Sequence, residues 1–435
     1  MYFSIHHKFA AKIGNILNLI ILSPHPDSIG NASEEIFFAT LKAKREKKKL
    51  VILYPKKIIQ FFIKNIYFYD KNFFNIDCDY FFFEHNSFWQ NFWSIIWSIY
   101  FIFSNFTHGF LKKIFKIKSN GHYWRPTLGQ DIIWTPNINS DEFDLKLFKA
   151  QKWDEQFKDK INFNFINEKK LKINLHNLGI GKNDWFVCLH VREGGFKKDW
   201  DNPLNANINN YIDAVKEIIN QGGYVVRCGD ISMQKLPKID GLIDYPFTKF
   251  KNPEMDLYLL KNCKFFVCMG SGPLDAANLL FRKRLLLVNT AQYLHGLPFN
   301  KGSYAIFKQV YSKNKKRYLS LKEYLLDAKK INNKWWISDD HELHENNKKE
   351  IKDAVIEMLN YKDESPRTNL QNQFRIEYKN CIKIFQNNFK FSLDKKENTY
   401  EWYRASPRMN FWEGEISNTF LENNWEQSSR NKDDV

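Results

Sequence analysis

Three apolar runs in the middle of the chain decide the fold: DWFVCLHVRE at 184–193, GGYVVRCGD at 222–230 and CKFFVCMGSGPLDAANLLFRKRLLLVN at 263–289. Each run is rich in Val, Phe or Leu and changes abruptly to glycine, polar or charged residues. Helical patterns lie between the runs, which is typical of parallel strands buried on both faces. Because ligands of open α/β sheets bind outside the carboxyl ends of the strands, the residues after each run are the first candidates for a site.

His190 and Arg192 end the first run and lie two residues apart, so their side chains point to the same side of the strand. The planar, permanently charged guanidinium of Arg192 suits a pyrophosphate. The alternative for His190 is a core histidine that is hydrogen-bonded beside the sheet. With an arginine and two glycines adjacent, we favour a role in the site.

The second run ends with Arg227, Gly229 and Asp230. An arginine within an apolar run must meet an anion to offset its desolvation, so it contacts either a ligand or an internal partner. Asp230 is the candidate internal partner. Asp244, after LID, and Asn289, at the end of LLLVN, are further polar residues at the same predicted sheet edge.

The third run contains Gly270, Ser271 and Gly272, followed by Pro273 at the first position of a predicted helix. Backbone N–H groups at the start of a helix can bind phosphate, and glycines permit close approach. The alternative is that both glycines serve only the turn.

Composition and motifs narrow the function. The chain of 435 residues is long enough for two domains, and its six cysteines form no CxxC pair, which predicts a reduced, cytoplasmic protein without structural zinc. No GKS/GKT loop, HExxH or GxSxG occurs, and no DxD lies along the predicted sheet, so neither a metal nor a cofactor is expected.

The formal net charge of +16 favours anionic partners: nucleotides, phospholipid surfaces or nucleic acid. The alternative is solvated surface lysine in a chain that is generally rich in Lys, Asn, Ile and Phe. Because no nucleic-acid-binding motif is present, we expect no specific nucleic-acid partner.

The N-terminal region predicts a second Rossmann-like unit. A strand at 17–22 leads to a turn with Asp27, Gly30 and Asn31, then to a helix from Ser33 with Glu34 in its first turn, and then to a strand in KLVILYP. The glycine turn either contacts a ligand or merely permits the chain to reverse.

FWQNFWSIIWSIYFIFSNF at 88–106, followed by KKIFKIK at 112–118, is the most apolar part of the chain. This pattern has two interpretations: a helix in the headgroup layer of an anionic membrane, or a core helix of the N-terminal domain. A membrane span is disfavoured by the polar residues within the run. The predicted location is the cytoplasm, with peripheral attachment to the inner membrane face in the first reading.

The sequence predicts domains at 1–178, 179–330 and 331–435, the last a helical extension with a disordered tail of about 15 residues. The order of LHVRE, GGYVVRCGD, EMDLYLLKNCKFFVCMGSG and LLLVN resembles a bacterial family of glycosyltransferases from surface-polysaccharide loci. IGNASEEIFFAT and WYRASPRMNFW resemble its early glycine turn and its near-terminal Ser-Pro element, so the resemblance covers nearly the whole chain.

The resemblance implies an α/β, GT-B-like fold: two Rossmann-like domains with parallel sheets facing a cleft, and the nucleotide-sugar donor held mainly by the second domain. A similar HxR element occurs in the fucosyltransferase-like group, where the arginine contacts the donor diphosphate, and Arg192 is expected to do the same. The chain departs from the family pattern at DNPLNANI, where an arginine-bearing segment is expected, and at Pro273.

The expected function is transfer of a sugar from a nucleotide sugar to a surface-glycan or lipid-linked acceptor. The alternatives are a sugar-nucleotide epimerase or hydrolase of the same fold, and a basic nucleic-acid-binding protein. The candidates for the catalytic base are His190, Asp27 and Glu34, and Gly30 and Asn31 belong to the acceptor side. The expected donor-binding residues are Arg192, Arg227, Gly229, Asp230, Asp244, Gly270, Ser271, Gly272 and Asn289.

Overall fold

The computed structural model describes residues 12–24, 29–62, 74–115, 161–196, 198–290, 297–298, 300–328, 338–392 and 413–430. The chain divides into two compact units. The first is Met1–Leu171 with Leu279–Phe281, and the second is Lys172–Asn278 with Arg282–Val435. The boundary at Leu171 falls within α7 (Glu168–Asn177).

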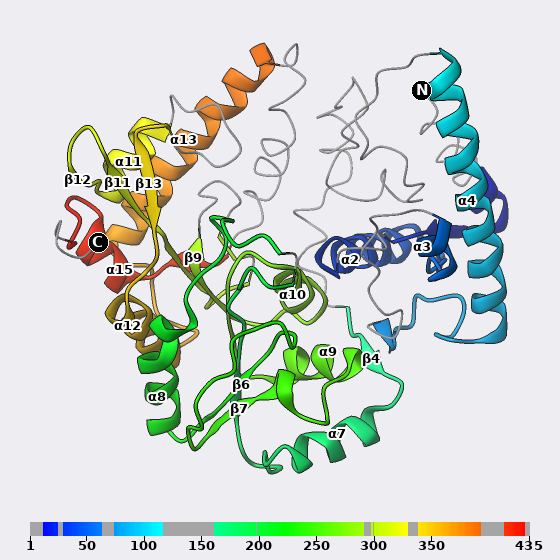
Figure 1. Ribbon diagram of the computed structural model, residues 1–435, viewed down its shortest axis with the longest axis horizontal. Helices are drawn as coiled ribbons and strands as arrows, with labels where there is room; N and C mark the ends of the chain where they lie inside the picture. Colours follow the sequence, from blue (N-terminus) through cyan, green and yellow to red (C-terminus); the bar gives the residue numbers. More distant parts are fainter. Residues whose placement is uncertain are drawn as a thin grey trace. The chain divides into compact units, whose positions relative to one another are not determined.

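A parallel sheet of seven strands forms the centre of the second unit (Figure 1). In spatial order the strands are β14 (Glu415–Ile416), β10 (Tyr304–Phe307), β9 (Leu285–Thr290), β8 (Phe266–Cys268), β5 (Phe186–Leu189), β6 (Tyr224–Arg227) and β7 (Leu242–Asp244). Every neighbouring pair is parallel. The runs that predicted buried strands are β5, β6, β8 and β9, and β5, β8 and β9 are buried along their whole length. The predicted α/β class is confirmed.

Helices with clear sequence signals flank this sheet. α8 (Ile212–Asn220) buries Ala214, Val215 and Ile218, and α12 (Lys348–Leu359), which packs against α8, begins with a capping box between Asn347 and Glu350. α9 (Pro253–Asn262) is capped by Asn252 and has proline at its start. The other elements of this unit include η2 (Ile208–Tyr211), η3 (Tyr245–Phe247), α10 (Gly272–Asp275), β11 (Gln309–Ser312), β12 (Arg317–Tyr318), α11 (Leu321–Ala328), β13 (His341–His344) and α13 (Asn369–Ser392).

The structure describes residues 413–430, so the expectation of a disordered tail is wrong for 421–430. α15 (Asn418–Asn424) is capped by Ser417, and Trp425 directly after it is buried at 2% exposure. β14 adds an edge strand to the sheet beside β10. The composition of the tail is polar, but Phe420, Leu421 and Trp425 supply enough apolar surface to dock it.

The first unit contains the βαβ arrangement that the sequence predicts. β1 (Leu19–Leu22) and β2 (Lys49–Ile52) pair in parallel and are joined by α2 (Ile29–Glu46). The helix begins at Ile29 and not near Ser33, whose Oγ donates to the carbonyl of Ile29 at 2.7 Å and does not cap the helix. The other elements are α3 (Ile58–Phe62), β3 (Ile76–Asp77), α4 (Phe88–Phe115) and β4 (Asn164–Phe165), with β3 and β4 antiparallel.

Candidate functional site

The strand order places a topological switch point at β5. From β5 the chain moves outward to β6 and β7, and then returns to the opposite side of β5 to form β8, β9 and β10. In open α/β sheets the crevice for a ligand lies at the carboxyl ends of the strands where the order reverses. His190 follows β5 and Ser271 follows β8, so both belong to this position.

His190 and Ser271 are in contact, 3.1 Å from Nδ1 to Oγ. The Ser271 hydroxyl also lies 3.2 Å from the carbonyl oxygen of Met269, to which it donates. A hydroxyl has one hydrogen, and that of Ser271 goes to the carbonyl of Met269. We therefore assign the hydrogen between Nδ1 and Oγ to Nδ1 of His190, which donates to Ser271. Nε2 then carries the lone pair of the imidazole.

The environment keeps His190 neutral. Burial lowers the pKa of His190 to about 4, and Asp230 opposes this shift while Arg227, Lys251 and Arg192 add to it. At neutral pH the ring is therefore a proton acceptor and not an acid. A hydrogen-bonded core histidine would also make this contact with Ser271, so the role of His190 in a site stays a prediction.

Arg192 is held beside His190 by the loop that follows it. Nε donates to Oδ1 of Asn205 at 3.1 Å, and Nη2 forms an ion pair with Asp199. These contacts use two of the five guanidinium N–H groups and leave the side chain 19% exposed. The loop thus fixes the position of the guanidinium, and a diphosphate role for Arg192 stays a prediction.

Arg227 requires a correction, because its side chain is completely buried, at 0% exposure. Nη1 donates to Asp244 Oδ1 at 2.9 Å and to the Gln234 carbonyl at 2.6 Å, and Nη2 donates to Glu193 Oε1 at 2.7 Å. Its ion-pair partners are thus Glu193 and Asp244, and not Asp230 as expected. We therefore place Arg227 in the framework of the site.

Asp244 belongs to the same framework. Its second oxygen, Oδ2, accepts the backbone N–H of Leu236 at 3.0 Å, so both oxygens have partners inside the protein. The second oxygen of Glu193 likewise accepts the N–H of Gln234 at 2.7 Å. The Arg227 cluster (Arg227, Glu193 and Asp244) joins the ends of β5, β6 and β7 through these bonds, and contact of Asp244 with a sugar is not supported.

Gly229 and Asp230 form the turn after β6. Gly229 has φ +145°, and Asp230 accepts the N–H of Ser232 at 2.8 Å through Oδ1. The carboxylate of Asp230 raises the pKa of His190, which places its charge near the imidazole. Asp230 is half-buried and remains a candidate for ligand contact.

Gly229 and Gly270 provide a matched pair of substitutions. Gly229→Ala is expected to lower the free energy of unfolding by about 1 to 3 kcal/mol, since its Cβ would lie 2.1 Å from Met233 Sδ in a backbone conformation that strains L-residues. A Cβ at Gly270 makes only an ordinary contact, 3.8 Å from Leu204 Cδ2. Gly270→Ala should therefore stay within about 0.5 kcal/mol of the wild type in urea unfolding. Equal losses for the two variants would contradict this distinction.

Ser271 precedes α10 with extended backbone angles, φ −152° and ψ 162°, but its side chain does not cap the helix. Pro273 lies in the first turn as expected. α10 has only four residues before the chain continues as the π-helix η4 (Ala276–Leu280), so it differs from the regular helix that the phosphate-seat prediction assumes. Binding of phosphate by the N–H groups of Ser271 and Gly272 remains a prediction.

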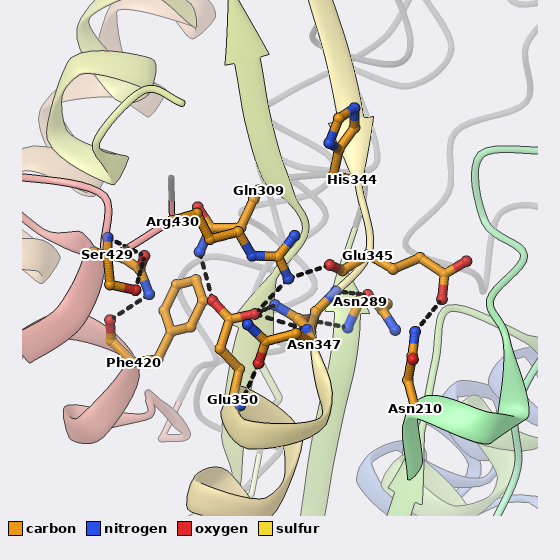
Figure 2. A network of polar contacts seen from close by, with 12 residues as sticks. Asn210, Asn289, Gln309, His344, Glu345, Asn347, Glu350, Phe420, Ser429 and Arg430 are labelled. Carbon is orange, nitrogen blue, oxygen red and sulfur yellow. Dashed lines mark hydrogen bonds and ion pairs between the residues drawn. The ribbon is translucent and has the colours of Figure 1, made fainter. Parts of the chain in front are cut away.

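Asn289 is also internal, at 1% exposure. Its N–H donates to Asn346 Oδ1 at 2.9 Å, its Oδ1 accepts the N–H of Asn346 at 2.6 Å, and its Nδ2 donates to the hydroxyl of Tyr211 at 3.0 Å. Figure 2 shows Asn289 within a polar network rather than at an open edge. The expectation that Asn289 contacts the donor is therefore wrong, because the oxygen and the nitrogen of its side chain are both hydrogen-bonded within the protein.

The same network attaches the C-terminal segment to the start of α12. Glu350 accepts from Gln309 Nε2 at 2.8 Å, from the N–H of Asn347 at 2.9 Å and from Arg430 Nη2 at 2.8 Å (Figure 2). The side chains of Arg430 and Glu350 are 5% and 8% exposed. This buried ion pair stabilises the arrangement around β9 and takes no part in the His190 site.

The candidates in the first unit are only partly described. Gly30, Asn31 and Glu34 lie in α2, and Glu34 is buried at 2% exposure. Glu34 is thus not presented to an acceptor, and Gly30 is a helical residue and not part of a turn before the helix. Asp27 lies outside the described residues.

Sequence reasoning missed Glu193, Asp199 and Asn205. Glu193 directly follows the HVR element, and an acidic residue at the end of the strand beside that of Arg227 is a signal that could have identified it as a partner. Asp199 and Asn205 lie in a loop without periodic pattern, and no feature of the sequence indicates that they bind Arg192.

Comparisons with known proteins identify no family for this chain. No protein-family model matches the chain, and no curated protein matches it. Among solved structures, the chain is similar to the crystal structure of the glycosyl transferase family 9 from Veillonella parvula DSM 2008. The identity is 9%, the match covers 62% of this chain and 80% of that chain, and the TM-score is 0.32.

Proposed function

We propose that the second unit binds a nucleotide sugar at the carboxyl ends of β5, β6 and β8, and that the protein is a glycosyltransferase acting on a surface-glycan or lipid-linked acceptor. The observation that carries the proposal is the 3.1 Å contact between His190 and Ser271 at the switch point of a parallel sheet. Arg192 follows on the same strand end, which supplies a fixed positive charge beside a neutral base.

In this proposal the donor occupies the open edge of the strands. The free N–H groups of Arg192 face the diphosphate, together with the backbone N–H groups of Ser271 and Gly272. Gly270 leaves space for close approach, and Asp230 accepts a hydrogen bond from a sugar or ribose hydroxyl. Charges fixed in this way stabilise the leaving diphosphate without metal.

His190 is the proposed base. The acceptor oxygen attacks the anomeric carbon, its proton moves to Nε2 of His190, and the bond between that carbon and the diphosphate oxygen breaks. The electron pair of the broken bond leaves with the nucleoside diphosphate. A single displacement of this kind inverts the anomeric configuration.

The donor part of the proposal is tested by thermal unfolding with a panel of nucleotide sugars. A donor at about 100 times its Kd should stabilise the native state by about 2.7 kcal/mol. Arg192→Ala should remove this stabilisation, and Gly270→Ala should reduce it. Lys182→Ala, which removes one exposed positive charge elsewhere in the second unit, should leave it unchanged.

Absence of stabilisation by every nucleotide sugar would overturn the donor site. Rapid conversion of the donor without an acceptor would instead indicate the epimerase or hydrolase alternative. A salt-sensitive shift with generic DNA or RNA, stronger than the response to nucleotide sugars, would favour nucleic-acid binding.

We also propose that the protein acts in the cytoplasm at the inner face of the membrane, with Asn31 on the acceptor side. The six cysteines are free and buried, which suits a reducing compartment. The net charge of +16 suits an anionic surface.

A further inference from the structure

The faces of α4 are the reverse of those of an ordinary surface helix. Gln90, Ser94 and Ser98, spaced four residues apart, face the first unit and are 5%, 1% and 0% exposed. Trp97 is the large apolar residue among them. A helix that packs on a core normally turns its apolar stripe inward and its polar residues outward.

Hydrogen bonds fix this orientation. Ser94 Oγ accepts the backbone N–H of Tyr54 at 3.1 Å, and Ser98 Oγ accepts that of Lys56 at 2.9 Å. The indole of Trp97 donates to Ser23 Oγ at 2.7 Å. Rotation of the helix to bury its other face would leave these buried groups without partners, which is unfavourable.

The opposite face of α4 carries large apolar side chains. At spacings of three and four residues the exposed stripe contains Phe92, Ile96, Ile99, Phe103, Phe106 and Phe110, which are between 40% and 66% exposed. This stripe is the outer face of α4. A soluble protein rarely exposes so continuous an apolar surface unless another apolar phase covers it.

α3 extends the outer face. Phe61 is 85% exposed, and Phe62, 45% exposed, lies against Phe106 with 6.5 Å between the ring centroids. Figure 1 shows α3 beside the long helix α4. The two helices therefore present one common apolar surface on the first unit.

The width of this surface indicates what covers it. With Trp93 and Ile95 at its edges, the exposed arc spans roughly 160° of the helix, at 100° per residue. A coiled-coil partner covers only the narrow a/d seam, whereas a bilayer interface covers a broad, flat face. Phenylalanine and tryptophan are also side chains that lie at the boundary between headgroups and acyl chains.

We propose that the outer face of α4, with α3, docks on an anionic lipid bilayer and lies in its interface. No helix formed by the described residues is long and apolar enough to cross a membrane. Lys57 is exposed and lies just before α3, and in the sequence further lysines follow the apolar run at 112–118. Such flanking lysines complement anionic headgroups.

The test measures co-sedimentation with vesicles made of phosphatidylcholine and phosphatidylglycerol, without any donor or acceptor. Ile99→Asp combined with Phe103→Asp should lower the partition coefficient about tenfold or more. The control is Ile173→Asp combined with Ile376→Asp, at 61% and 60% exposure compared with 55% and 66%. The control should bind like the wild type, and both double variants should unfold cooperatively.

Loss of binding in the α4 variant alone, with weaker wild-type binding to pure phosphatidylcholine and at high salt, supports the proposal. Equal binding by both variants, or no binding by the wild type, overturns it. A dimer in light scattering that the α4 substitutions dissociate, without vesicle binding, would assign the surface to a second copy of the chain and would also overturn it. Because glycosyl transfer is not measured, failure here leaves the donor site unaffected.

Discussion

Replacing Arg227 by alanine is expected to destabilise the second unit by about 3 to 5 kcal/mol, the cost of breaking a buried ion pair by removing one partner. The substitution leaves the carboxylates of Glu193 and Asp244, only 14% and 17% exposed, without their cation. It also removes the bond to the carbonyl of Gln234. Urea unfolding followed by circular dichroism measures the loss.

Arg317 provides the matched control. Its guanidinium also binds a carboxylate through two nitrogens, with Nη1 and Nη2 donating to Glu323, but the side chains are 51% and 32% exposed. Arg317→Ala should cost at most about 1 kcal/mol, because solvent screens this pair. Similar losses for the two alanine variants would show that burial does not decide the strength of the Arg227 cluster.

A combined variant separates the charge from the packing. Arg227→Met with Glu193→Gln and Asp244→Asn removes the cation and both anions together, so no charge is left buried and unpaired. We expect it to be more stable than Arg227→Ala, in line with the behaviour of buried ion pairs replaced as a group. A combined variant less stable than Arg227→Ala would indicate that the arginine contributes mainly by filling space.

The ion-pair partners of Arg227 could not be predicted from the sequence alone. The need for an anion near Arg227 followed from its apolar surroundings, but Asp230 was the expected partner because it is near in sequence. In the parallel sheet, Arg227 is in register with Asp244 on β7 and with Leu189 on β5, four residues before Glu193. Register between strands selects the partner, and a single sequence does not reveal it.

Strand positions were predictable because buried parallel strands require continuous apolar runs. The contact of His190 with Ser271 depends on the pairing of β5 with β8, which the sequence did not predict. The hydrogen-bond partners of Asn289 were not predictable, because Asn346 is 57 residues away in the sequence. The orientation of α4 was also left open by its composition. In retrospect Gln90, Ser94 and Ser98 mark a polar stripe at helical spacing, which is the signal that distinguishes the inward face.

His190→Gln is expected to lower kcat for glycosyl transfer by about 10²- to 10⁴-fold, the usual contribution of a general base. Glutamine keeps a polar side chain next to Ser271 but cannot take a proton. Donor binding, measured as thermal stabilisation, should change little, because Arg192 and the backbone of Ser271 and Gly272 remain. The matched control is His344→Gln, since the Nδ1 of His344 also contacts a hydroxyl, that of Tyr318, at 2.7 Å.

The pH dependence gives an independent check of His190. The pKa of its imidazole is about 4 in the folded protein, as a result of burial, and about 6.5 in the unfolded chain. Between these values the unfolded state binds more protons, so the contribution of His190 to stability is lost as the pH falls from 6.5 to 4. The loss approaches about 3 kcal/mol, and His190→Gln should lack this component.

The same pKa separates the role of a base from a merely structural role. If neutral His190 accepts the proton, the acidic limb of kcat/KM that depends on it lies near pH 4 and not near 6.5. Ser271→Ala removes the group that orients Nδ1, and should reduce kcat less than His190→Gln while leaving the histidine able to titrate. A wild-type kcat in His190→Gln would exclude the imidazole as the base and direct the search to the first unit, where Asp27 is the remaining candidate.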